Sequence, residues 1–187
     1  NSPYMSPSAF AGNEWLVDLV ELAQQGWLDA DDVAPLPGGD ADRVDYAAAI
    51  AWRRQRLEKA AAAFAARAKG QQRSAFEQFC AAQADWLDDY ALFQACAAEW
   101  PGGSWRDWPA TIARREPAAV NEVRRHLGRR MMFEQYVQWV ASLQWQSARA
   151  ALKAHGVALF GDLPFVVDAH SADVWARQDE FLTEVSV

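Results

Sequence analysis

Residues 157–160 constrain the fold of this chain more than any other stretch. They form a short, wholly apolar run with a glycine on each side. Such a run predicts a strand that is buried on both faces, as strands in parallel sheets are. A helical pattern over about residues 117–155 leads into the strand, and Asp162 follows at its carboxyl end, where ligand-binding groups collect in α/β sheets and barrels. This order of helix, strand and acid predicts a piece of the wall of a (β/α) barrel.

Helical patterns occupy most of the sequence between residues 45 and 155, which we expect to fold as a helical cluster. Asp45 is placed to cap a helix that has an apolar stripe and, opposite it, a basic stripe. The apolar stripe consists of Tyr46, Ile50, Leu57, Ala61 and Phe64, and the basic stripe of Arg53, Arg54 and Lys59. We expect Gly70 to end this helix, and a last long helix to begin near Pro117, since proline suits the first helical turn. The chain is therefore predicted to be mainly α.

Charge and composition narrow the classes of function. The net charge of −7 argues against nucleic acid and anionic membranes as partners, because both attract clustered positive charge. No apolar run approaches the roughly 20 residues of a membrane span, and no signal-like N-terminus is present, so we expect a cytoplasmic chain. Cys80 and Cys96 lie in helical, apolar patterns and are predicted to be free thiols.

Metal and cofactor sites are not predicted. Asp85, Asp88 and Asp89 cluster on one helical pattern, but acids beside apolar residues are more often caps or part of a solvent-exposed face than metal ligands. No histidine lies near a cysteine at the spacing of a usual metal site. Glycine-rich phosphate loops and nucleotide fingerprints are absent from the sequence.

His170 lies beside Ser171 and Asp173, the three residue types of a Ser-His-Asp triad. A triad requires the side chains to converge in space, which adjacency in sequence generally prevents. We therefore do not expect a triad here. Asp162 remains as a candidate acid, and alone it supplies at most one of the two carboxylates that glycoside chemistry requires.

The chain contains ten tryptophans, a high number for 187 residues. Tryptophan side chains pack in protein cores, and they also provide flat apolar faces for sugars. Trp105 and Trp108 lie three residues apart in a turn region, where packing of the loop onto helices is favoured over a sugar platform. An acidic, helical, tryptophan-rich chain also fits a non-catalytic glucan-binding or protein-interaction module. This class of function stays open as the alternative to an enzyme.

Several blocks carry a more specific signal. They are SPY at 2–4, SAFAGN at 8–13, LVDL at 16–19, DY at 45–46, WLDDYALF at 86–93, GSWRDWP at 103–109, GDLPFV at 161–166 and SADVW at 171–175. In this order they closely resemble the amylomaltases, the 4-α-glucanotransferases or disproportionating enzymes of glycoside hydrolase family 77. The resemblance covers the whole chain.

The resemblance implies a (β/α)₈ barrel with a helical insertion between its second and third strands. Residues 1–30 would be the barrel loop and helix after the second strand, and residues 31–116 the helical insertion subdomain. Residues 117–187 would hold the long helix, the third barrel strand and the loop that follows. Enzymes of this family transfer α-1,4-glucan segments between maltooligosaccharides by a retaining double displacement, in which an acceptor sugar replaces water in the second step.

Three residues of this chain are similar to substrate-binding residues of the family. Tyr4 resembles the aromatic residue that stacks on the sugar at the cleaved bond, Ser2 a polar neighbour of the sugar, and Asp162 the third-strand acid that holds the sugar ring. Without the resemblance, loop packing for Tyr4, a turn cap for Ser2 and a strand-end hydrogen bond for Asp162 would be the favoured interpretations.

The catalytic acids of the family have no counterpart here. Its nucleophile lies in an Arg-x-Asp-His motif on the fourth strand, which is absent from this sequence, and its acid/base glutamate comes later still. The resemblance therefore implies an interior slice of the enzyme, without nucleophile or acid/base and inactive by itself. It implies no cofactor, and α-1,4-glucans and maltooligosaccharides as partners.

A single barrel strand without neighbours would leave its backbone hydrogen-bonding groups unpaired, and such an edge invites pairing with another chain. We therefore expect residues 45–155 to fold as a unit. The two ends are expected to be frayed, remodelled or paired between molecules, so that the chain self-associates through its unpaired strand edges.

Overall fold

The computed structural model describes residues 5–35, 43–161 and 166–182. These residues form eight α-helices and four short 3₁₀ helices, which confirms the prediction of a mainly α chain. In chain order the elements are η1 (Glu14–Leu16), α1 (Leu19–Gln24), η2 (Ala30–Val33), α2 (Tyr46–Arg67), α3 (Gly70–Ala82), α4 (Ala84–Glu99), η3 (Trp105–Asp107), α5 (Ala110–Ala113), α6 (Pro117–His126), α7 (Gly128–Ala154), α8 (Ala172–Ala176) and η4 (Gln178–Glu180).

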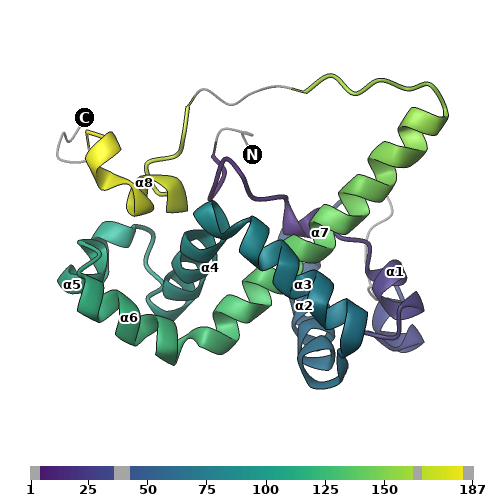
Figure 1. Ribbon diagram of the computed structural model, residues 1–187, viewed down its shortest axis with the longest axis horizontal. Helices are drawn as coiled ribbons and strands as arrows, with labels where there is room; N and C mark the ends of the chain where they lie inside the picture. The colour runs from purple at the N-terminus through teal and green to yellow at the C-terminus, as the bar shows by residue number, and fades with distance from the viewer. Residues whose placement is uncertain (1–4, 36–42, 162–165, 183–187) are drawn as a thin grey trace.

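Helix α7 is the axis of the molecule. It runs diagonally across the molecule, with α5 and α6 toward its first residue and α1 toward its last, and α3 crosses it in this view (Figure 1). It packs against α2, α3, α4, α6 and η1. Its 27 residues span roughly 40 Å at 1.5 Å per residue, so a single helix can bridge both halves of the molecule.

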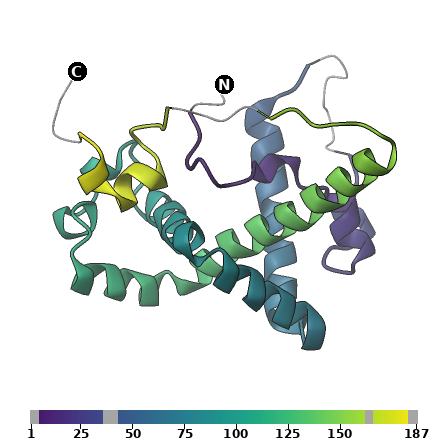
Figure 2. The same cartoon turned by 45° about the horizontal axis from the view of Figure 1, so that its top comes forward.

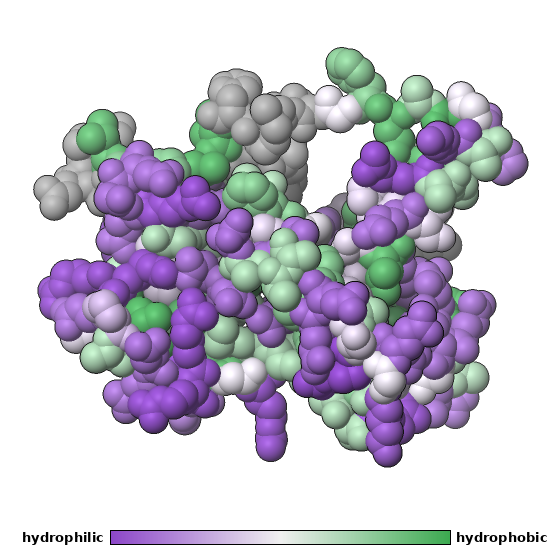
Figure 3. Space-filling view, viewed as in Figure 1, coloured by the Kyte–Doolittle hydropathy of each residue, from purple (hydrophilic) through white to green (hydrophobic). Residues whose placement is uncertain are grey.

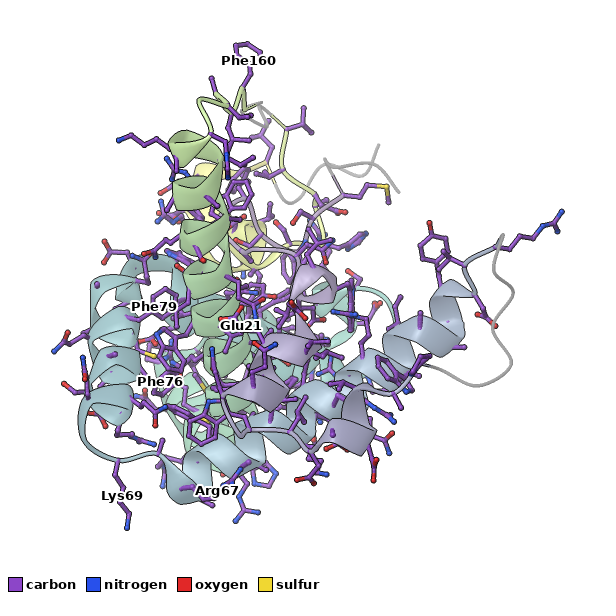
Figure 4. The ribbon with its side chains drawn as sticks, turned by 90° about the vertical axis from the view of Figure 1, so that its right-hand side faces the viewer. Glu21, Arg67, Lys69, Phe76, Phe79 and Phe160 are labelled. Atoms are coloured by element: carbon purple, nitrogen blue, oxygen red, sulfur yellow. The ribbon has the colours of Figure 1, made fainter. Side chains whose placement is uncertain are left out.

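Two clusters of buried apolar side chains lie along α7. One cluster is built by α4, η3, α5 and α8, and centres on Phe93, Trp108 and Trp175. The other is built by α1, α2, α3 and α7, and centres on Phe64. Figure 4 shows Phe76 and Phe79 on the side of α3 that faces α7, and Phe79 packs against both clusters.

Helix α2 begins as predicted. The Asp45 side chain caps it by accepting a hydrogen bond from the Ala48 amide at 3.0 Å. The helix ends at Arg67, three residues before Gly70, which we expected to end it. Gly70 is instead the first residue of α3, and its φ of +55° is a left-handed value that suits glycine.

The predicted apolar stripe of α2 is correct only in its C-terminal half. Leu57 and Phe64 are fully buried, whereas Tyr46 is 73% exposed and Ile50 is 39% exposed. The reason is that the first turns of α2 lie beyond the cluster around Phe64, so the described residues leave Tyr46 and Ile50 exposed.

The predicted long helix over residues 117–155 is two helices. Leu127 separates α6 from α7 with φ −93° and ψ 11°, and Figure 1 shows the change of direction there. The break leaves no backbone group of Leu127 unused, since its amide bonds to Val123 and its carbonyl accepts from Met131. Gly128 follows directly, and its low helix propensity favours a break at this point. The bend also buries the Leu127 side chain against the α4 cluster.

The predicted strand at residues 157–160 is absent. Among the residues described, none is in a β-strand, and residues 157–161 form an extended segment. Phe160 is fully exposed, and Val157 and Leu159 are about half exposed. Figure 3 shows this segment as apolar surface standing away from the helices, and Phe160 lies at its tip in Figure 4. A strand forms only when a neighbouring strand pairs with its backbone groups, and no such neighbour lies within the described ranges.

Both cysteines are free thiols, as predicted. Burial raises the pKa of Cys80 to about 11 and that of Cys96 to about 12. Because the thiolate is the reactive form, both thiols are expected to be inert at neutral pH. Within the described ranges, no helix combines the length and the apolar character that crossing a membrane requires.

Candidate functional site

The three predicted substrate-binding residues, Ser2, Tyr4 and Asp162, lie outside the residues that the structure describes. The structure does describe the segments that follow them in sequence, residues 5–13 and 166–175. Both segments contain sequence blocks singled out above, at residues 8–13 and 171–175, and the geometry around them defines the candidate site.

The two segments meet at Asp173 on α8. The Asp173 carboxylate accepts hydrogen bonds from the Ser8 hydroxyl at 3.1 Å and from the Ala9 amide at 2.7 Å. The Ala172 amide donates to the Pro7 carbonyl at 2.8 Å. We call these three hydrogen bonds the α8 clasp. It joins parts of the chain that are about 165 residues apart in sequence.

The N-terminal segment is also held by its own side chains. The Ser6 hydroxyl donates to the Ser8 carbonyl at 2.7 Å, and the Phe10 amide donates to the Ser8 hydroxyl at 3.1 Å. The Phe10 ring stacks on Trp86 of α4, with centroids 6.1 Å apart and an interplanar angle of 22°. Figure 2 shows this segment passing from α8 toward η1 beside α7.

Two glutamines of α7 hold the same segment further along. Gln138 donates to the Gly12 carbonyl at 3.0 Å and accepts from the Gly12 amide at 2.8 Å. Gln144 makes the same pair of bonds with Asp18, at 3.0 Å and 2.7 Å. Each side-chain amide therefore pairs with one backbone residue as a neighbouring strand would.

A partly buried cluster of charges lies between η1, α2 and α7. Glu134 is 1% exposed and accepts a hydrogen bond from Arg54 at 3.0 Å, while Glu14 lies 3.8 Å from the same guanidinium. Burial, aided by the charge of Glu14, raises the pKa of Glu134 to about 7. Burial also raises the pKa of Glu14, against the influence of Arg54. One cation thus faces two desolvated carboxylates.

The predicted basic stripe of α2 needs a correction at this point. Arg54 and Arg53 were expected on the outer side of the helix, but Arg54 pairs with buried Glu134 and Arg53 donates to the Val17 carbonyl. A signal was present in the sequence. Glu134 and Gln138 lie four residues apart within an otherwise apolar stripe of α7, and a buried polar residue requires a partner.

His170, Ser171 and Asp173 do not converge. The Ser171 hydroxyl is fully buried and caps α8 by accepting from the Val174 amide at 3.2 Å. The His170 amide donates to the Asp168 carboxylate at 2.8 Å, and the Asp173 carboxylate bonds the N-terminal segment. The geometry therefore gives these residues structural roles.

The paired tryptophans pack, as predicted, onto the helices. Trp105 and Trp108 are each only 6% exposed. The Trp105 indole donates to the Ala169 carbonyl at 2.9 Å, and the Trp175 indole donates to the Ile112 carbonyl at 3.2 Å. Both bonds hold the chain on either side of Asp173.

The acidic cluster of α4 holds helices together. Asp89 pairs with Arg115 at 2.7 Å and with Arg124 at 3.1 Å, which ties α4 to the chain around α6. Asp88 accepts from Gln135 of α7 at 3.1 Å. The expected role as caps or solvent-exposed face is thus wrong for Asp88 and Asp89. Across the described part of the chain, no group of three or more His, Cys, Asp or Glu side chains could hold a metal ion.

The chain is similar to known proteins over its whole length. The model of the 4-alpha-glucanotransferase family, glycoside hydrolase family 77, matches residues 1–187. A 4-alpha-glucanotransferase of Synechocystis is 40% identical over 97% of this chain and 36% of its own length. One of Thermus thermophilus is 38% identical over 97% of this chain and 35% of its own length.

A solved structure, amylomaltase from Streptococcus agalactiae in complex with acarbose, has a TM-score of 0.89 at 30% identity and covers 97% of this chain and 36% of that one. The chain therefore spans about a third of the length of these relatives. Because the family model matches the chain from end to end, this chain belongs to the 4-alpha-glucanotransferases of glycoside hydrolase family 77.

Proposed function

We propose that this chain supplies part of the substrate-binding wall of a 4-α-glucanotransferase. That enzyme transfers α-1,4-glucan segments between maltooligosaccharides by a retaining double displacement. Ser2, Tyr4 and Asp162 contact the sugar, with the Tyr4 ring stacked on it. The nucleophilic aspartate and the acid/base glutamate come from outside these 187 residues, so the chain is inactive by itself, and the reaction uses no cofactor.

We also propose the architecture that the family resemblance implies. Residues 31–116 are a helical insertion into a (β/α)₈ barrel, with residues 1–30 and 117–187 joining it to the barrel. Residues 157–160 become the third barrel strand when a neighbouring strand pairs with them. The exposed apolar side chains of that segment support this, since a barrel would bury them.

One observation carries the proposal. The described fold matches an amylomaltase over 97% of this chain with a TM-score of 0.89, at a sequence identity of 30%. The α8 clasp adds support from the chain itself, because it joins the segment after Tyr4 to the segment after Asp162. Two loops that carry parts of one sugar site must be held together in this way.

A chimera tests the function. This chain replaces the aligned segment of the Thermus thermophilus relative, and disproportionation of maltotriose is followed by glucose release. The chimera is expected to be active and the 187-residue chain alone inactive. Within the chimera, Tyr4→Ala is expected to lower kcat/KM about 10- to 100-fold, about 1.4–2.8 kcal/mol of transition-state stabilisation, while the control Tyr4→Phe keeps the ring and most of the activity.

Two results would contradict the function. Activity of the isolated chain would show that the catalytic acids lie within it. A chimera that melts cooperatively but leaves maltotriose unchanged would favour the alternative, a non-catalytic helical module that binds glucan or protein.

Self-association of the isolated chain is also part of the proposal. The exposed apolar segment at residues 157–160 is expected to pair between molecules, so the sedimentation coefficient should rise with protein concentration. Leu159→Asp together with Phe160→Asp should remove the concentration dependence. Leu182→Asp, at a position that is 89% exposed elsewhere on the surface, serves as the control. A wild-type chain that sediments as a monomer at every concentration would rule this out.

A further inference from the structure

We infer that Asp173 is a positioning residue of the sugar site, which acts on the substrate through Tyr4 by fixing the loop that carries it. The inference rests on the proposed function and adds a residue to it. Tyr4 lies three residues before Pro7 in sequence, and Pro7 is the first residue of the α8 clasp, so the clasp holds the chain close to Tyr4 in sequence.

Both carboxylate oxygens of Asp173 are used on the N-terminal segment. Oδ1 accepts from the Ser8 hydroxyl and Oδ2 from the Ala9 amide. Hydrogen bonds to an ionised acceptor are roughly twice as strong as bonds between neutral groups. Ser8 is only 2% exposed, so water competes little for its side chain. Asp173 therefore supplies two of the three bonds of the clasp.

Asp173 is not needed to cap its own helix. Ser171 does this, since its hydroxyl accepts from the Val174 amide, and it is fully buried. An Asp173 that only stabilised α8 would direct its oxygens to amides of α8. Instead it directs them to a segment about 165 residues away in sequence.

The chain on both sides of Asp173 is anchored by buried tryptophans. Trp105 donates to the Ala169 carbonyl on one side, and Trp175 is fully buried and donates to the Ile112 carbonyl on the other. Arg115 lies over the Trp175 ring, 4.3 Å from its centroid. Because these contacts hold Asp173 in place, its carboxylate can fix the position of the loop to which it is hydrogen-bonded.

The N-terminal loop is also held by hydrogen bonds other than those to Asp173. Ser6 and Phe10 both bond Ser8, and Gly12 is held by Gln138. These bonds therefore hold the segment from Ser6 to Gly12 together, and the α8 clasp fixes that segment relative to α8. Removal of Asp173 frees the segment at the end nearest Tyr4.

The test is a double-mutant cycle in the chimera described above. Asp173→Ala alone is expected to lower kcat/KM for maltotriose about 10- to 100-fold, because small misplacements of a substrate-contacting group are costly. Asp173→Asn keeps one acceptor and is expected to recover part of the loss. If Asp173 acts through Tyr4, adding Asp173→Ala to Tyr4→Ala lowers kcat/KM no further.

Asp179→Ala is the matched control, since it removes an exposed carboxylate six residues further along the chain. It is expected to leave kcat/KM unchanged. In the 187-residue chain, Asp173→Ala is expected to accelerate deuterium exchange at the Ala9 amide, which Asp179→Ala leaves protected. The exchange rate at Ala9 reports whether the α8 clasp is formed, and it does not require an active enzyme.

The outcomes separate the inference from the proposed function. Losses from Asp173→Ala and Tyr4→Ala that multiply in the double variant overturn the inference, as does an active chimera that is unaffected by Asp173→Ala. Unchanged exchange at Ala9 also overturns it. A cooperatively melting wild-type chimera without activity overturns the proposed function itself, whatever the exchange result.

Discussion

Replacing Phe64 by alanine is expected to lower the free energy of unfolding of this chain by about 3–5 kcal/mol, the usual cost of removing a buried phenyl ring. Phe64 is fully buried on α2. Its ring lies 5.0–5.4 Å from four aromatic rings, those of Trp27, Phe76, Tyr136 and Trp139. These rings come from separate parts of the fold, so the cavity that alanine leaves cannot close by a shift of one helix.

Urea unfolding followed by circular dichroism measures this loss. Phe160→Ala is the control, because it removes the same ring from a fully exposed position, and it is expected to change stability by less than about 0.5 kcal/mol. Equal effects of the two substitutions would mean that Phe64 does not anchor the cluster between α2, α3 and α7.

The second large effect is a dependence of stability on pH that originates at Glu134. Burial and the charge of Glu14 raise the pKa of Glu134 from 4.5 to about 7 in the folded chain. Between these two values the folded state keeps a proton that the unfolded state releases, so the contribution of Glu134 is complete below pH 4.5 and is lost as the pH rises through 7. At about 1.4 kcal/mol per pKa unit, the loss is about 3 kcal/mol.

Glu134→Gln isolates this contribution, because glutamine is neutral at every pH and can still accept the hydrogen bond from Arg54. The variant should match the wild type near pH 5 and exceed its stability by up to about 3 kcal/mol near pH 8. Glu58→Gln is the control, since it neutralises an exposed carboxylate 3.4 Å from the same Arg54. A difference between Glu134→Gln and wild type that stays constant from pH 5 to pH 8 would refute the assignment.

Local sequence was sufficient where local interactions decide the structure. The cap at Asp45 and the buried half of α2 follow from residues within a few turns of each other, and both were predicted. The break at Leu127 was missed because a single glycine such as Gly128 is tolerated inside an otherwise helical pattern. It depends on burial of Leu127 against α4, a contact that periodicity within one helix does not contain.

Residues 157–160 show what local sequence could not predict. Their composition and flanking glycines suit a strand, yet a strand needs a pairing partner, and that partner can be distant in the sequence. Within the described residues no partner exists, and the same sequence adopts an extended, exposed conformation. The sequence pattern therefore predicts that this segment can form a strand, whereas the presence of a neighbouring strand decides whether it does.

The candidate site was predictable in part. Sequence motifs identified both loops that meet at the α8 clasp, but they gave no sign that Asp173 would bond Ser8 and Ala9. Arg54 was assigned to the outer side of α2, because a helical pattern shows which side of a helix is apolar but not that a second helix carries a buried carboxylate. Contacts between distant segments were the part that could not be predicted.

The glutamine pairs of α7 also govern how this loop can change in evolution. Gln138 and Gln144 lie six residues apart and bind the main chain of Gly12 and Asp18, which are likewise six residues apart. Recognition of main-chain atoms admits other side chains; even at Gly12 an added methyl carbon would lie 3.6 Å from Ala141, an ordinary contact. A single inserted or deleted residue between the two anchors would put one of them out of register. Homologues should therefore conserve the length of this segment between the two anchors.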